Sequence, residues 1–184
     1  MRGPGLWLQG RGAPRFALIM KIDRAWPVLA ILTGVAVDQA TKLFARSVLV
    51  PGEVHSYLGG CLWIDLVRNR GAFLSLGSSL SEPMRQGLLV GGVAAFLAVA
   101  LGWLLFSKTS TPGSRWTMAA VVAGGSGNLV DRIWFQGGVV DFLNVGIGNL
   151  RTGIFNVADM YITGAVVFVL ASSLGKRKAT GTPR

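Results

Sequence analysis

The sequence predicts an all-α membrane protein with four transmembrane helices and a small extracytoplasmic β-sheet cradle. Its 184 residues are 51% hydrophobic and only 14% charged, whereas about a quarter of the residues in a soluble domain are charged. The segment 87–106 has no charged residue, and about 20 apolar residues in a helix cross the hydrocarbon core of a bilayer. The charges lie mostly at the ends of such segments, so we expect an integral membrane protein.

Four apolar segments are expected to form one transmembrane helix each. They cover residues 25–44, 87–106, 116–133 and 156–174. The first and third carry charges only toward their C-terminal ends, and Asp159 lies near the start of the fourth. Because consecutive helices alternate in direction, these three ends lie on the same side of the membrane. Residues 25–175 are therefore expected to form one domain with its polar groups at one surface.

The distribution of lysine and arginine predicts which side is cytoplasmic, because cytoplasmic loops are enriched in both. The basic tail 1–24, the loop between the second and third helices, and the tail 176–184 hold 11 of the 18 basic residues. Both tails are therefore expected in the cytoplasm. We interpret residues 1–24 as a disordered extension, with Met20 as an alternative start. A cleaved signal peptide with residues 25–37 as its apolar core is a second interpretation.

Two segments are expected outside the membrane, at residues 46–85 and 134–155. Alternate positions are apolar in residues 62–67, a pattern typical of a half-buried strand. A second strand is expected at residues 139–145 in the glycine-rich segment. A small sheet above the outer helix ends would shield a site from bulk water.

Charged side chains on two of the helices are spaced for mutual contact. Asp38 and Lys42 at i and i+4 can form an ion pair, and Asn128, Asp131 and Arg132 share one face of the third helix. Asp131 and Arg132 are adjacent, so each needs a partner elsewhere, such as Lys42 or Asp38. Buried charges need compensation whatever the function. A structural network that ties the helix ends together is therefore the alternative to a chemical role.

Asp141 and Asp159 have different expected surroundings. Asp141 lies between apolar residues, where desolvation raises a carboxyl pKa as a general acid requires; a turn at the strand end is the alternative. Asp159 follows Asn156 by three residues, as in a capping box, where the helix dipole favours a carboxylate. One neutral and one ionised carboxyl group form the apparatus of an aspartic hydrolase, although capping alone also explains Asp159.

Other features exclude some functions and leave others open. Cys61 and His55 are each the only residue of their type, so we expect neither a disulfide within the chain nor a metal or cofactor. The net charge of +10 would suit a nucleic-acid binder, but the sequence has no basic helix of the kind that such proteins use. Asn69 is either a turn residue or a contact for a peptide backbone. Glycines at 124, 125 and 127 are typical of close helix packing.

Five motifs then occur in order along the chain. They are Asp38-Gln-Ala-Thr-Lys42, Asn69-Arg-Gly-Ala, Gly124-Gly-Ser-Gly-Asn-Leu-Val-Asp-Arg132, Val139-Val-Asp-Phe and Phe155-Asn-Val-Ala-Asp159. With these motifs the chain resembles the lipoprotein signal peptidases (signal peptidase II), which are aspartic endopeptidases of bacterial membranes. It departs from the family at 73–75 (Phe-Leu-Ser), at Ala120, where the family tends to have glycine, and in its longer N-terminal extension.

The resemblance implies that Asp141 and Asp159 are the catalytic pair. It assigns supporting or substrate-contacting roles to Asp38, Lys42, Asn69, Gly71, Asn128, Asp131, Arg132, Asn156 and Ala158. The implied substrate is a prolipoprotein that carries diacylglycerol on a cysteine and is cut just before that cysteine at the outer face of the inner membrane. We expect a monomer in contact with membrane lipid and no nucleic acid.

Two other function classes remain as alternatives, a small transporter that uses the outer carboxylates as an ion site and a structural assembly factor. Transporters tend to break their helices and bind ions at mid-membrane, whereas the charges here lie at the helix ends. That position favours the peptidase.

Overall fold

The computed structural model describes residues 13–71 and 81–180 of the protein. The helices are α1 (Ala13–Val48), α2 (Glu82–Gln86), a π-helical turn (Gly87–Gly92), α3 (Val93–Phe106), α4 (Pro112–Trp134) and α5 (Val157–Thr180). The strands are β1 (His55–Tyr57), β2 (Leu62–Asn69), β3 (Val139–Ile147) and β4 (Leu150–Arg151). The predictions for residues 1–12, 72–75 and 181–184 lie outside the described residues.

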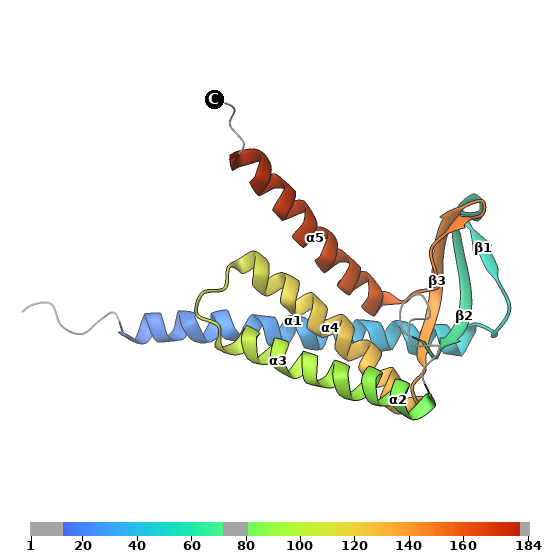
Figure 1. Ribbon diagram of the computed structural model, residues 1–184, viewed down its shortest axis with the longest axis horizontal. Helices are drawn as coiled ribbons and strands as arrows, with labels where there is room; N and C mark the ends of the chain where they lie inside the picture. Colours follow the sequence, from blue (N-terminus) through green and yellow to red (C-terminus); the bar gives the residue numbers. More distant parts are fainter. Residues whose placement is uncertain (1–12, 72–80, 181–184) are drawn as a thin grey trace, which may run out of the picture.

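Helices α1, α3 and α4 pack side by side, and the sheet stands across the end where α1 and α4 finish (Figure 1). Helix α5 starts beside the sheet and diverges from the other helices along its length. The start of α1 and the end of α5 thus lie away from the sheet.

Helix α1 begins at Ala13, well before the predicted start of the first span. The prediction of a disordered extension is therefore wrong from Ala13 onward. The physical reason is local, because residues 13–24 contain no glycine and their proline, Pro14, lies in the first helical turn, where it is tolerated.

Three helical segments of the described chain are long and apolar enough to cross a membrane. They are Ala25–Val48, Glu82–Phe106 and Val157–Gly175, which contain most or all of the first, second and fourth predicted spans. Helix α4 covers the third predicted span with 23 residues, but it is not among these three because glycines and polar residues interrupt its apolar sequence.

Helix α4 lies against three other helices and approaches each of them through a glycine. A Cβ atom at Gly124 would collide with the backbone carbonyl of Ala158 in α5, and one at Gly127 would collide with the Asp38 carboxylate of α1. A Cβ atom at Gly125 would lie 2.7 Å from a methyl group of Leu97 in α3. The predicted close packing at these glycines is confirmed.

The strands form one antiparallel sheet in the order β1-β2-β3-β4. Both predicted strands are confirmed as parts of β2 and β3, which pair with Val67 opposite Asp141 and Asn69 opposite Val139. The short strands β1 and β4 were not predicted. Phe155 bridges to Leu143 just before α5 begins, so the chain places the start of α5 beside β3.

Candidate active site

A capping box holds Asp159 at the start of α5. The Asp159 amide donates to Asn156 Oδ1 (3.0 Å), and the Asn156 amide donates back to Asp159 Oδ2 (3.1 Å). This reciprocal pair satisfies two backbone donors of the first helical turn. The predicted capping is confirmed, and it fixes the Asp159 carboxylate near the positive end of the helix dipole.

Asp141 lies in β3 with only 2% of its surface exposed, as its apolar neighbours predict. Its Oδ1 accepts a hydrogen bond from Asn156 Nδ2 (2.7 Å) and its Oδ2 accepts one from Asn69 Nδ2 (3.0 Å). Burial raises the pKa of Asp141 from 3.8 to about 6; the charge of Asp159 acts in the same direction, whereas the two amide hydrogen bonds lower it. Asp141 can therefore keep a proton in weakly acidic surroundings.

Two asparagine side chains connect the two aspartates. Asn156 Nδ2 donates both to Asp141 Oδ1 and to Asn128 Oδ1 (3.0 Å), while Asn128 Nδ2 donates to Asp159 Oδ1 (2.9 Å). Residues from β3, α4 and α5 thus form one continuous hydrogen-bonded chain. Each carboxylate accepts bonds only from N–H donors of neighbouring residues within the described part of the protein, so their orientations are restricted.

Lys42 is the central charge of an adjoining network, with 2% of its surface exposed. Its Nζ lies 2.8 Å from Asp38 Oδ2 and 3.1 Å from Asp131 Oδ2, and it donates to Asn128 Oδ1 (2.9 Å). The predicted Asp38–Lys42 ion pair is confirmed, and Lys42 is the partner that Asp131 needed. The Lys42 ammonium group can only donate hydrogen bonds, so the side-chain oxygen of Asn128 faces Lys42. The amide nitrogen of Asn128 then faces Asp159.

The carboxylates bound to Lys42 extend the network to other elements. Asp38 Oδ1 accepts a hydrogen bond from the Ala158 amide of α5 (2.9 Å), and Asp131 Oδ2 accepts one from the Val140 amide of β3 (2.9 Å). The helix ends are thus tied together as the structural interpretation requires. Lys42 also contacts Asn128, and Asn128 contacts Asp159, so the structural network and the two aspartates form one unit.

Gln39 joins this network although the sequence reasoning missed it. Its Nε2 lies 3.2 Å from Asp38 Oδ2, 3.1 Å from Asp131 Oδ1 and 3.1 Å from the Gly127 carbonyl oxygen. Lys42 supplies one positive charge to two carboxylates, and the amide of Gln39 supplies further donors to both. The position of this amide side chain directly after Asp38 and one turn before Lys42 was the available signal.

Asn69 and Arg132, the remaining predicted polar residues, both lie near the Asp141–Asp159 pair, but within the described part of the chain only Asn69 is hydrogen-bonded to it. Asn69 ends β2, and its Oδ1 accepts the Gly71 amide (2.9 Å), so Asn69 both forms a turn and contacts Asp141. Arg132 does not join the Lys42 network. It is half-buried within electrostatic reach of both Asp141 and Asp159, and its Nε has no hydrogen-bond partner among the described residues.

Comparison with known proteins identifies the family. The family model described as signal peptidase (SPase) II matches residues 30–175. The chain belongs to the signal peptidase II family. Within it, the lipoprotein signal peptidase of Treponema denticola is 35% identical over 146 residues, which cover 77% of this chain and 84% of that protein. That of Borrelia hermsii is 30% identical over 170 residues, covering 88% and 99% of the two chains.

A solved structure described as a bacterial membrane enzyme supports the fold. It has a TM-score of 0.70 at 22% identity and covers 87% of this chain and 94% of its own. Signal peptidase II membership thus confirms the resemblance seen in the five motifs. It indicates a protease of lipoprotein processing that crosses the bacterial inner membrane more than once.

Proposed function

We propose that this signal peptidase II is an aspartic endopeptidase in which Asp141 and Asp159 activate one water molecule. The observation that carries the proposal is the hydrogen-bonded chain Asp141–Asn156–Asn128–Asp159. It joins a buried carboxyl group with a pKa of about 6 to a carboxylate at a helix start. Two carboxyl groups with unlike surroundings divide naturally into an acid and a base.

In this mechanism the ionised Asp159 takes a proton from the water as it attacks the carbonyl carbon of the scissile peptide bond. Protonated Asp141 donates a hydrogen bond to the carbonyl oxygen and then gives a proton to the leaving nitrogen as the carbon–nitrogen bond breaks. Asp159 gains one proton and Asp141 loses one, so the number of protons on the pair is unchanged after the reaction. The two carboxyl groups share their protons, so they titrate as a pair.

The other site residues divide into two proposed roles. Lys42, Asp38, Asp131, Asn128 and Asn156 hold the aspartates in position through the contacts described above, and Ala158 presents its amide to Asp38. Arg132, Asn69 and Gly71 contact the substrate. Arg132 lies within electrostatic reach of both aspartates, and its Nε has no hydrogen-bond partner in the part of the chain that the structure describes, which supports this division.

The proposed substrate is a prolipoprotein that carries a diacylglyceryl group on a cysteine and is cut just before that cysteine. The names of the relatives in Treponema and Borrelia support a lipoprotein substrate. A lipidated substrate stays in the bilayer, so its scissile bond lies near the membrane surface. The network at the helix ends is at a suitable depth for such a bond.

We place four spans in the membrane, with α4 as the third and with the tails 1–24 and 176–184 in the cytoplasm. Polar residues of α4, such as Asn128 and Asp131, are buried against other helices. A span that is surrounded by protein does not need the apolar composition of a lipid-facing helix. The active site is then at the outer face.

The direct test is cleavage of a diacylglyceryl-modified preprolipoprotein by the purified protein in detergent, followed by mass spectrometry. Asp141→Asn and Asp159→Asn should each reduce the rate by roughly 100-fold or more, because each removes one proton-transfer group. Glu53→Gln, which changes an exposed carboxylate, is the matched control and should cleave normally. Efficient cleavage by either aspartate variant would refute the pair.

A further inference from the structure

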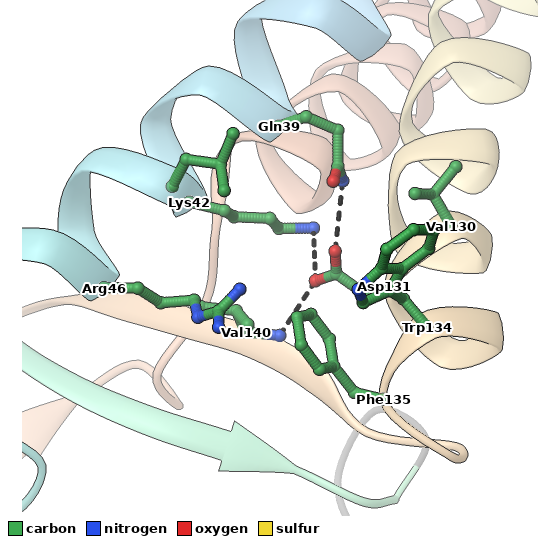
Figure 2. A pocket seen from close by; sticks show the side chains of 9 residues that line it. Gln39, Lys42, Arg46, Val130, Asp131, Trp134, Phe135 and Val140 are labelled. Atoms are coloured by element: carbon green, nitrogen blue, oxygen red, sulfur yellow. Dashed lines mark hydrogen bonds and ion pairs between the residues drawn. The ribbon is translucent and has the colours of Figure 1, made fainter.

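A cavity lined by both polar and apolar side chains adjoins the Lys42–Asp131 ion pair. It has a volume of about 300 Å³ and is bordered by α1, α4 and β3, but neither Asp141 nor Asp159 lines it. Figure 2 shows Gln39 and Lys42 each in contact with Asp131, with Arg46 reaching toward the same space from the next turn of α1. The cavity is separate from the proposed catalytic pair.

The outer edge of this cavity is apolar and exposed. Leu43 of α1 and Trp134 at the end of α4 are 62% and 78% exposed, and Val130 also borders the cavity with its side chain partly open. Exposed leucine and valine on membrane helices face lipid, and tryptophan prefers the level of the lipid headgroups. With the membrane placement proposed above, the cavity therefore opens toward lipid at headgroup depth.

Two arginines without an acidic partner among the described residues lie next to the cavity. The guanidinium groups of Arg46 and Arg68 lie over the ring of Phe135, at 4.6 and 5.5 Å from its centroid. Within residues 13–71 and 81–180, neither has a carboxylate within ion-pair distance. Asp131 at the floor is already compensated, since it accepts from Lys42, Gln39 and the Val140 amide.

We infer that this cavity binds the phosphate of an anionic phospholipid from the outer leaflet, with Arg46 as its main ligand. A guanidinium group matches the geometry of phosphate oxygens, and basic pockets between transmembrane helices bind lipid headgroups. The exposed Leu43 and Trp134 provide contacts for the glycerol and acyl chains, which a free phosphate lacks. The diacylglyceryl group of the proposed substrate carries no phosphate, so this site goes beyond the proposed function.

The test is native mass spectrometry of the purified full chain, offered equal amounts of phosphatidylglycerol and phosphatidylcholine with identical acyl chains. The wild-type protein should retain phosphatidylglycerol preferentially. Arg46→Gln should lower that retention roughly fivefold, the effect expected of one basic residue at an anionic lipid surface. Arg85→Gln removes a positive charge that is paired with Glu82 and, as the matched control, should retain the lipid like wild type.

A second variant tests the cavity without changing charge. Val130→Trp places a large side chain at the cavity edge and should also reduce retention, whether or not Arg46→Gln folds normally. Equal retention of both lipids by the wild type would overturn the inference, as would unchanged phosphatidylglycerol retention in both variants. Full displacement by soluble glycerol phosphate would assign the site to a free phosphate and reject the lipid. Retention does not require cleavage, so this result is independent of the peptidase mechanism.

Discussion

At the end of the bundle that carries the sheet, α1, α4 and α5 meet through buried polar contacts, whereas at the opposite end α5 diverges from them (Figure 1). There, Trp26 and Trp116 join α1 to α4 with ring centroids 4.1 Å apart. A mostly apolar cavity of about 600 Å³ extends from these rings to Tyr161 of α5. Helices in lipid associate through close packing and interhelical hydrogen bonds and not through a hydrophobic driving force, so we expect the polar end to contribute more than the divergent end to holding the helices in place.

The largest effect is expected when the central positive charge at the polar end, Lys42, is removed. Lys42→Met leaves Asp38 and Asp131 buried without their cation, and breaking a buried pair in this way costs about 3–5 kcal/mol. We expect a matching fall in the free energy of unfolding, measured in detergent, and loss of cleavage. A variant that stays stable would show that Gln39 and the backbone amides suffice to hold both carboxylates.

A smaller loss is expected where α4 touches α5. Gly124→Ala forces a Cβ atom against the Ala158 carbonyl, and overpacking of this kind costs typically about 1–3 kcal/mol. Gly164→Ala is the matched control, since a Cβ atom there meets no heavy atom within 4 Å among the described residues. Thermal unfolding should separate the two variants; equal midpoints would mean that the polar end tolerates helix displacement.

The pH dependence of cleavage tests whether Asp141, at the polar end, acts as the proton donor. Protonated Asp141 is the proposed acid, so kcat/KM should fall about tenfold per pH unit above the pKa of about 6 that burial gives this group. The hydrogen bond from Asn69 favours the ionised form and lowers the pKa. Asn69→Ala should therefore move the alkaline limb to higher pH. A limb that moves to lower pH would contradict this assignment.

The smallest effect is expected at the divergent end. Ala120 lines the apolar cavity there, and Ala120→Leu adds a side chain where space is available. We expect the free energy of unfolding to change by less than about 0.5 kcal/mol, as for substitutions away from strained or tightly packed sites. A large destabilisation in the same detergent assay would show that this end is as closely packed as the other.

Local features of the site could be predicted because they depend on nearby residues. The Asp38–Lys42 pair and the Asn156–Asp159 capping box follow from spacing along one helix. The burial of Asp141 follows from its apolar neighbours in β3. By contrast, the three-way position of Gln39 and the exclusion of Arg132 from the Lys42 network depend on where α4 lies relative to α1.

The apolar helices, the two main strands and the residues available for chemistry could be predicted from the amino-acid sequence, because periodicity and capping act over a few residues. The connection of Asp141 to Asp159 through the amides of Asn156 and Asn128 could not be predicted in this way and is seen only in the folded protein. That arrangement requires three elements to meet, and Lys42 to orient the Asn128 amide. Such contacts depend on helix packing at glycine positions, which no pattern within a single segment specifies.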